Sequence, residues 1–584
     1  MKPERRDWII LGLAVVLVIS FLLYDTTPFK SWWIQNPDYG VLLKYGTTEG
    51  PEDLDPMVAW DENSFAVQDQ VCEGLFGYNY STTNMEIIPR LAKDFGSWNL
   101  SGLLPIYTVQ LRNDVWFHDG TKFDAHAAKW NFERLKYFID NGMAKAAELF
   151  QYFDAKSELY RDIINKTEIV NDFELKFMFN IPYGAFEALL CFNAAYMISP
   201  VSSSYSEVIN TLAGDLVGTG PFVYDRYKLD EEVIFHAWDY YWAPRAKIDT
   251  LIFKIVGFPI ETFNALEDRT VDIITDNKAA LIECTLCGCQ YYLDLSKIRS
   301  TRMIFLGINN YWINSTLRKA ISYAFNGTSL NNLLFCMDWF PNESPIPLGM
   351  KYSNSSYNEP NLNITYAREI MQNMGFGADL DKNYPGLNET EWKNSAFMNF
   401  NFTYSATSSY LGLFYNSLKG QLSLIGINLT DAWTYWTPFL YCLYEVQAYH
   451  RNMLQLYWLG WTPDYNDPIN FINLLFTNRT VADNGCKYNG YLAAKEAGRN
   501  PFNLWDNVQL LMEEVLIETN QTIRWIYYNR IQEILIEEDM PVVFGYVETN
   551  YDAWYKGLKG YPSNPMDKVY FYPCYWNLTS LYYQ

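Results

Sequence analysis

The sequence lacks the short motifs that mark common enzyme active sites. It contains no G-x-S-x-G nucleophile motif, no H-E-x-x-H zinc motif and no phosphate-binding G-x-x-x-x-G-K loop. The glycine pair in Gly218–Phe222, GTGPF, lacks the third glycine of a dinucleotide-binding loop. Only four histidines occur in 584 residues, and no two are adjacent. We therefore expect a protein that is not an enzyme.

Positive charge is also scarce. The chain has 44 Lys and Arg against 67 Asp and Glu, which gives a net charge of −23 and a pI near 4.7. Nucleic acid is not an expected partner, because proteins that bind it carry basic stripes. Aromatic residues, by contrast, make up 17% of the chain, including 20 Trp and 46 Tyr. These are enough to line a cleft in addition to filling a core.

One long apolar run occurs, and it lies near the N-terminus. A basic lead, MKPERR, is followed by the uncharged residues 8–24, which span roughly 25 Å as a helix and carry an aromatic residue at each end. We expect residues 1–29 to form one transmembrane helix that anchors the rest of the chain outside the plasma membrane. The alternative is a cleaved signal peptide, although no small-x-small cleavage site follows the run. The first cysteine is Cys72, so no lipid-anchor cysteine is available.

Sequons for N-glycosylation are more numerous than chance pairing of Asn with Ser and Thr produces. This surplus predicts a glycosylated surface protein and is typical of an archaeal cell surface, although an Asn- and Thr-rich composition alone is the alternative. The candidate positions are Asn79, Asn99, Asn165, Asn314, Asn326, Asn342, Asn354, Asn363, Asn388, Asn401, Asn428, Asn478, Asn520 and Asn577.

The nine cysteines form no recognisable metal motif. Cys284, Cys287 and Cys289 lie close together, but the other cysteines are scattered and no second close pair supplies a fourth zinc ligand. A disulfide within a surface loop is favoured over a metal site, and an odd number leaves at least one cysteine unpaired in an extracellular chain.

Helix and strand patterns alternate along the chain, which predicts a mixed α/β fold. Residues 40–46, GVLLKYG, and 107–123 read as strands. Asp124 is placed to cap a following helix whose apolar positions share one face. Residues 504–538 read as long amphipathic helices that stop before a proline, and the following VVFGYV reads as a short strand.

The stretch Gly460–Phe471, GWTPDYNDPINF, places two carboxylates in a loop rich in aromatic rings. Its prolines end the apolar run before it. A carboxylate in such a loop suits either turn chemistry or a ligand cation held away from water.

Eleven segments in the same order resemble the extracytoplasmic solute-binding proteins of peptide ABC transporters, the oligopeptide- and dipeptide-binding family (solute-binding protein family 5). The resemblance covers about residues 40 to 550. The segments are DLDPMVAWDENSFAVQDQVCEGLFGYN, IIPRLAKDF, YTVQLRNDVWFHDGTKFDAHAAKWNFER, GTGPFVYDRY, DYYWAPRAKIDTLIFKIV, LEDRTVDIITD, TLRKAISYAFN, SPIPLGM, YNEPNLNITYAREIMQNMGF, WTPDYNDPINF and IQEILIEEDMPVVFGYV.

The resemblance implies a two-lobed α/β clam of the periplasmic-binding-protein type (class II) with an extra subdomain. Lobe I is expected at about 40–75, 206–276 and 546–584, the extra subdomain at 76–205 and lobe II at 277–545. The chain is expected to cross between the lobes near residues 276 and 546, which form the hinge.

The resemblance also implies a ligand-binding residue. In peptide-binding members the aspartate of the W-x-x-D motif pairs with the α-ammonium group of the ligand, and Asp464 occupies that position. The neighbouring Trp458, Gly460, Trp461 and Tyr465 are expected to line the ligand site and exclude water. A turn role is the alternative for Asp464.

The same resemblance implies partners. The loaded receptor is expected to dock on a membrane permease driven by cytoplasmic ATPases, and it needs no cofactor of its own. The run before Asp464 carries no basic residue for a ligand carboxylate, so cello-oligosaccharide binding on aromatic platforms remains an alternative. A glycosylated structural or sensor protein of the cell surface is a second alternative.

Overall fold

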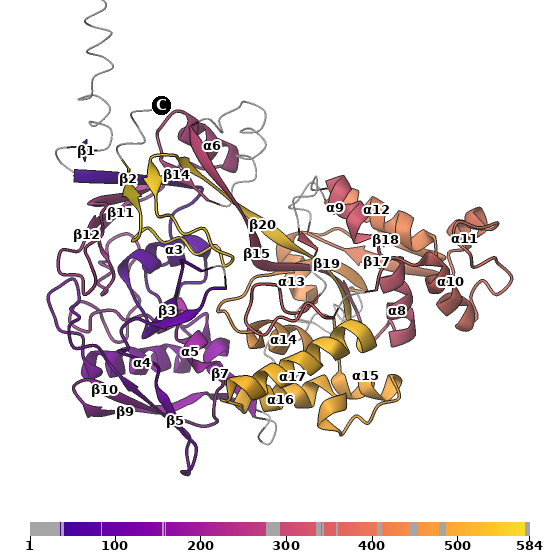
Figure 1. The fold of residues 1–584 in the computed structure, drawn as a ribbon, viewed down its shortest axis with the longest axis horizontal. Helices are drawn as coiled ribbons and strands as arrows, with labels where there is room; N and C mark the ends of the chain where they lie inside the picture. Colours follow the sequence, from indigo (N-terminus) through magenta and orange to yellow (C-terminus); the bar gives the residue numbers. More distant parts are fainter. Residues whose placement is uncertain are drawn as a thin grey trace, which may run out of the picture.

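The chain folds into two α/β lobes joined by a pair of long strands (Figure 1). In the part of the chain that the structure describes, no helix is long and apolar enough to cross a membrane. The predicted anchor (residues 1–29) and the cysteines of 284–289 lie outside that part. This computed structural model describes residues 35–36 and 40–577, apart from 83, 155–156, 158, 276–291, 335–339, 342–343, 358–359, 406–410, 444–453 and 478–485.

A single sheet, with twelve strands among the described residues, extends through both lobes. The short strands β1 (Gln35–Asn36) and β16 (Phe340–Pro341) pair with β2 and β20. The main order is β11 (Phe222–Lys228), β12 (Glu232–Ala237), β13 (Thr250–Ile255), β2 (Gly40–Thr47), β14 (Ile273–Ile274), β20 (Val542–Tyr555), β15 (Leu293–Ile308), β19 (Leu456–Trp461), β17 (Met398–Thr403) and β18 (Ile427–Asp431).

The strands β15 and β20 carry the sheet from one lobe to the other. They pair antiparallel from Leu293↔Tyr555 to Gly307↔Val542, with register shifts midway along β15. One end of the pair adjoins β14 in lobe I, and the other end adjoins β19 in lobe II. The prediction of a short strand at VVFGYV is therefore wrong in length. The strand β20 has 14 residues, and nearly all of them are buried between neighbouring elements.

Lobe I is completed by helices and a small hairpin around the first strands. The predicted strand at residues 40–46 is confirmed as β2. The other elements are α3 (Glu62–Val71), α6 (Pro259–Glu267), β21 (Leu558–Lys559) and β22 (Tyr575–Trp576).

The extra subdomain is attached to lobe I and has its own sheet, in the order β5-β6-β10-β9. The strand predicted at residues 107–123 is present only at its beginning, as β6, because the chain turns after it. Its elements are β3 (Phe76–Tyr78), β4 (Ile87–Pro89), β5 (Ser97–Asn99), β6 (Ile106–Gln110), α4 (Ala125–Asp140), η1 (Ala147–Phe150), β7 (Gln151–Asp154), β8 (Leu159–Asp162), β9 (Ile164–Asn171), β10 (Glu174–Phe179), α5 (Phe186–Leu189) and η2 (Asn193–Ala195).

The helix α4 begins where its cap predicts. Asp124 accepts hydrogen bonds from two backbone N–H groups of the first turn, which otherwise have no partner within the helix. The expected apolar face is buried at Ala128, Phe132 and Leu135. Arg134 from the same helix is fully buried.

Arg134 ties this helix to lobe I through a buried ion pair. Its Nη1 and Nη2 donate to the two carboxylate oxygens of Asp55 at 3.0 and 2.5 Å. Its Nε and Nη2 also donate to the backbone carbonyls of Ser204 and Glu207 at 2.8 and 2.9 Å. The ion pair and these hydrogen bonds together offset the free-energy cost of removing the guanidinium from water, as a buried charge requires.

Lobe II is built from helices that cover its end of the sheet. The predicted helical region 504–538 is confirmed, although the helices break between Ile517 and Gln521. The elements are α8 (Ser315–Ala324), α9 (Gly327–Leu334), α10 (Ile364–Asn373), α11 (Glu389–Ser395), α12 (Leu411–Ser423), α13 (Trp436–Leu443), α14 (Ile469–Phe476), α15 (Gly490–Glu496), η5 (Leu504–Asp506), α16 (Val508–Ile517), α17 (Gln521–Glu533) and η6 (Ile534–Asp539).

The largest hydrophobic core does not stay within one lobe. Lobe I and the sheet side of lobe II each have a separate core. The largest cluster includes Phe186 and Leu189 from the extra subdomain and Phe471 and Val508 from lobe II. In Figure 1, α16 and α17 accordingly lie beside α5 and β7.

His118 fastens the extra subdomain to lobe I. Its backbone N–H donates to the carbonyl of Gly218 at 3.0 Å, and its ring Nε2 lies 2.9 Å from the carbonyl of Gly220. Because a carbonyl can only accept, Nε2 carries the proton. Nδ1 is buried without a hydrogen-bond partner among the described atoms, so protonating it is unfavourable. Burial lowers the pKa of His118 to about 4.

The pKa of His118 predicts a loss of stability in mild acid. The unfolded residue titrates near its ordinary pKa of 6.5, so the contribution is fully present above that pH and is lost as the pH falls toward 4. The loss amounts to about 3 kcal/mol. Urea unfolding between pH 7 and pH 4 measures it. His118→Gln keeps a donor for the carbonyl of Gly220. Between pH 7 and pH 4, its free energy of unfolding should fall by about 3 kcal/mol less than that of the parent.

His126, in the first turn of α4, provides the control, because its side chain is exposed to water. His126→Gln should follow the parent through the same pH range. Identical acid losses in the parent and in His118→Gln would contradict the assigned role.

Candidate functional site

The candidate site is a cavity of about 420 Å³ between the two lobes. Lobe I contributes residues 45–48 at the carboxyl end of β2, residues 60–69 around α3, and residues 561–569 near the C-terminus. Asp552 of β20 also lines it, and lobe II contributes residues 462–464. A cavity of this size outside the carboxyl end of a strand, between two lobes, suits a small organic ligand.

Asp464 reaches this cavity from the loop after β19. Its backbone N–H donates to Asn470 Oδ1 at 2.9 Å, and its Oδ2 accepts from Asn470 Nδ2 at 2.8 Å. Asn470 lies in α14 and is buried. This reciprocal pair holds the carboxylate in one orientation while it remains partly exposed.

The loop that carries Asp464 is fixed by a buried ion pair three residues later. Arg524 Nη2 lies 2.7 Å from both carboxylate oxygens of Asp467, and the hydroxyl of Tyr528 donates to Oδ1 at 2.9 Å. Asp467 also accepts the backbone N–H of Ile469 at 3.1 Å. Asp467 thus takes part in the turn before α14 and also forms an ion pair with α17.

The five residues predicted for the ligand site do not lie together. Asp464 lines the cavity, whereas Gly460 is exposed at the end of β19. Trp458 is 6% exposed and packs in the lobe II core, with its ring centroid 3.9 Å from that of Phe414. Trp461 is partly buried in the sheet, opposite a residue of β15.

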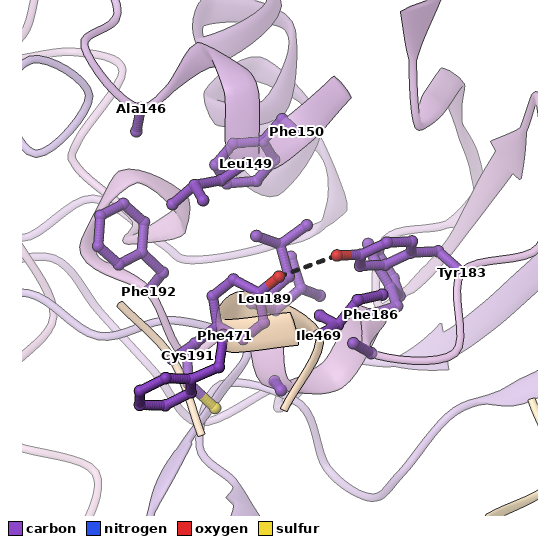
Figure 2. Close-up of a cluster of buried hydrophobic side chains, with 14 of the residues drawn as sticks. Ala146, Leu149, Phe150, Tyr183, Phe186, Leu189, Cys191, Phe192, Ile469 and Phe471 are labelled. Atoms are coloured by element: carbon purple, nitrogen blue, oxygen red, sulfur yellow. Dashed lines mark hydrogen bonds between the residues drawn. The ribbon is translucent and has the colours of Figure 1, made fainter. Parts of the chain in front are cut away.

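Tyr465 and its neighbour contact the extra subdomain instead. The hydroxyl groups of Tyr183 and Tyr465 lie 2.9 Å apart, in a buried hydrogen bond that Figure 2 marks with a dashed line at Tyr183. The backbone N–H of Asn466 donates to the hydroxyl of Tyr78 at 2.9 Å. Its side-chain amide donates to the carbonyls of two residues in the β3–β4 hairpin. The loop thus bridges the cavity and the subdomain.

Apolar packing completes this contact. Figure 2 shows Tyr183 and Phe186 of the extra subdomain beside Ile469 of α14. Gly184 donates its backbone N–H to the carbonyl of Leu516 at 3.0 Å. A Cβ at Gly184 would lie 2.0 Å from a backbone oxygen of lobe II, so only glycine permits this approach.

An aromatic wall of the cavity was not foreseen from the sequence. Trp60, Phe65 and Phe192 pack edge to face, with centroid distances of 6.1 Å for Trp60–Phe192 and 5.6 Å for Phe65–Phe192. Lys568 Nζ lies 5.1 Å from the centroid of Phe65. Phe192 belongs to the subdomain and Lys568 to the last part of the chain, so no local motif connects them.

Metal chemistry has no counterpart in the described ranges. Within them, no group of three or more His, Cys, Asp or Glu is arranged to hold an ion.

Of the fourteen sequons, twelve fall in the described ranges and none of their asparagines is buried. Glycosylation at these positions stays a prediction.

A ligand-sized cavity between two α/β lobes that share one sheet is the arrangement expected of a two-lobed solute-binding protein. Residues 86–483 match the family described as "Bacterial extracellular solute-binding proteins, family 5 Middle". The match covers more than half of the chain. The chain belongs to this family.

Individual relatives are distant. The dipeptide-binding protein of Escherichia coli K12 is 22% identical over 562 residues, which cover 91% of this chain and 93% of the relative. The solved structure of DppA from Helicobacter pylori in complex with peptide STSA is 22% identical with a TM-score of 0.65, over 92% of this chain and 98% of that chain. NikA from Brucella suis in complex with Fe(III)-EDTA is 16% identical with a TM-score of 0.72, over 92% and 100%. At these identities the structures show the shared fold.

Removing Arg524 should destabilise the protein strongly. Arg524→Met leaves the Asp467 carboxylate buried without its cation, so the free energy of unfolding should fall by about 3–5 kcal/mol. Urea titration at neutral pH measures the change.

Arg530→Met in the same helix is the matched control. Arg530 pairs with Glu533 and Glu538 where water has access, so its removal should cost about 1 kcal/mol or less. Equal effects of the two substitutions would show that the buried pair does not anchor the loop.

Proposed function

We propose that the chain is the extracellular receptor of an ABC importer and captures oligopeptides or dipeptides in the interlobe cavity. The observation that carries the proposal is the position of Asp464, a carboxylate oriented by Asn470 at the edge of that cavity. Family membership supports solute capture and not catalysis. Two of the relatives described above are named for a dipeptide or solved with a peptide.

The chemistry of a peptide terminus suits this carboxylate. An aspartate is ionised at neutral pH, and a charge-assisted hydrogen bond to an ammonium group is short and strong. The hydrogen bonds from Asn470 fix the carboxylate before the ligand arrives, which reduces the entropy lost on binding. The W-x-x-D position of Asp464 in the family resemblance supports the same assignment.

Capture on this model involves lobe closure about β15 and β20. These strands are the described connection between the lobes near residue 546, and their pairing is irregular midway along β15. Bending there moves Asp464 relative to the lobe I walls, which closes the cavity around a ligand. The predicted second crossing, near residue 276, lies outside the described ranges.

The proposed partners follow from this role. A loaded receptor delivers its ligand to a membrane permease with cytoplasmic ATPases, and the apolar run in residues 1–29 anchors it at the outer face of the membrane. Confinement near the permease raises the effective concentration there. The apolar run and its basic lead support the anchor.

Oligosaccharide binding is the second candidate, and the aromatic wall favours it. Trp60 is 40% exposed and lines the cavity together with Tyr45 and Tyr561. The exposed ring of Trp60 is suited to stacking on a sugar. A neutral sugar has no ammonium group, so this ligand class does not require an ion pair with Asp464.

Asp464→Ala should weaken peptide binding by at least about thirtyfold, because truncating one partner of a desolvated charge pair costs about 2–5 kcal/mol. Calorimetric titration of the full-length chain with a pool of tri- to hexapeptides measures the affinity. N-terminal acetylation of the peptides should weaken binding to the parent by a similar factor, since it removes the ammonium group.

Asp379→Ala serves as the control, because Asp379 is an exposed carboxylate of lobe II away from the cavity. Its affinity should match that of the parent. Binding of cello-oligosaccharides that survives Asp464→Ala, with no peptide binding, would move the assignment to sugar uptake.

A further inference from the structure

We propose that the extra subdomain controls how long the interlobe cavity retains its ligand. It does so through the two residues that follow Asp464, which contact the subdomain. This inference rests on the proposed function, in which Asp464 binds the ligand. It assigns positioning roles to Tyr465, Asn466, Tyr183 and Gly184, none of which lines the cavity.

Three consecutive residues of the loop after β19 face two different parts of the molecule. Asp464 lines the cavity. The hydroxyl of Tyr465 lies 2.9 Å from that of Tyr183, and both side chains are buried. The backbone N–H of Asn466 donates to the hydroxyl of Tyr78 at 2.9 Å. We call these two interactions with the subdomain the loop contact. Because neighbouring Cα atoms are about 3.8 Å apart, a shift of Asp464 disturbs the loop contact directly.

The side chain of Asn466 strengthens the loop contact. Its Nδ2 donates to the carbonyls of Asn84 and Met85, in the β3–β4 hairpin, at 3.1 Å each. Asn466 is buried, so moving it away from the hairpin leaves donors without partners until water reaches them. The loop therefore has one preferred position relative to the subdomain.

Asn470 connects the loop contact to the ligand carboxylate. It holds Asp464 through the two hydrogen bonds described above. It also lines a second, smaller cavity of about 80 Å³ between the subdomain and lobe II, together with Tyr183 and Tyr465. Unfilled volume and polar pairs are features of domain interfaces that separate during function.

Gly184 shows how closely the subdomain approaches lobe II beside the loop contact. Its backbone N–H donates to the carbonyl of Leu516 at 3.0 Å. A Cβ at this position would overlap the carbonyl oxygen of Glu518 and Nη1 of Arg524. Arg524 is also the partner of Asp467, so the approach at Gly184 and the anchor of the loop meet at one guanidinium.

The loop contact and the ligand stabilise each other. Only the loop position that the subdomain holds presents Asp464 to the ligand, so the apparent affinity scales with the fraction of molecules in which the contact is formed. By linkage, ligand binding stabilises the contact by the same factor. A ligand still enters a receptor without the contact but leaves sooner, since variants of one site differ mainly in dissociation.

Gly184→Ala tests the proposal without altering any group that lines the cavity. The added methyl group prevents the close approach of the subdomain. For the tightest-binding member of the tri- to hexapeptide pool, the dissociation rate constant should rise by at least about tenfold. The association rate constant should change by less than about twofold. Stopped-flow measurements on the full-length chain give both constants.

Gly102→Ala is the matched control. Gly102 lies exposed between β5 and β6 of the same subdomain, and a Cβ there makes only an ordinary contact with the carbonyl oxygen of Leu104. Both rate constants should equal those of the parent.

Removal of the paired hydroxyl groups separates the loop contact from general stability. Tyr183→Phe should raise the dissociation rate constant by about threefold or more and lower the melting temperature, because it leaves the hydroxyl of Tyr465 unpaired. Adding Tyr465→Phe removes the unpaired group, so the melting temperature should recover while fast dissociation persists. Tyr240→Phe, at an exposed ring of lobe I, should change neither quantity.

Hydrogen exchange measures the reciprocal effect of the ligand. Saturation of the parent with the same peptide should slow exchange at the amides of Gly184 and Asn466 by at least about tenfold. The amide of Leu111, which donates to the carbonyl of Phe173 within the subdomain, should exchange at an unchanged rate.

The outcomes distinguish this inference from the proposed function. Peptide binding with unchanged dissociation in Gly184→Ala and Tyr183→Phe would overturn the role of the loop contact and leave the proposed function standing. Lower melting temperatures without faster dissociation would do the same and identify the contact as purely structural. Binding of no peptide by the folded parent would overturn the proposed function and the inference together. Should Gly184→Ala not fold, the tyrosine variants decide the question.

Discussion

The antiparallel pairing of β15 with β20 is the constraint on which the rest of the structure depends. These two strands connect the sheet of lobe I to that of lobe II. They therefore determine how the lobes face each other and place Asp552, on β20, in the wall of the cavity. Their buried main-chain hydrogen bonds keep the connection intact while leaving bending as the accessible motion.

The loop after β19 is held from both sides of this connection. Asp467 binds Arg524 within lobe II, and Asn466 binds the β3–β4 hairpin of the extra subdomain. Between the ends of this loop, Asp464 is oriented by Asn470 and faces the cavity. Under the proposed function, a rigid support of this kind lets the carboxylate bind a ligand without reorganisation. The acidic and aromatic walls of lobe I are then positioned opposite it.

Local signals in the sequence predicted local structure well. The strand β2, the start of α4 and its Asp124 cap follow from patterns a few residues long, and ordered motifs identified the family. The aromatic site residues could not be placed in the same way. Trp458 has the same ring whether it faces a core or a cleft, and its burial depends on strand pairing that no local pattern specifies.

The cavity wall and the pair of Asp467 with Arg524 join residues far apart in the chain, so only the folded topology reveals them. The length of β20 was missed because a strand buried on both faces shows no alternation. The limits of the lobes taken from the family resemblance stay predictions.

The hydrophobic core shared by the extra subdomain and lobe II has a thermal consequence. Any separation of the lobes at that contact exposes Phe186, Leu189 and Phe471 to water. Exposure of apolar surface raises the heat capacity, and the penalty for it weakens on cooling. Separating the lobes at that contact would therefore cost less free energy on cooling.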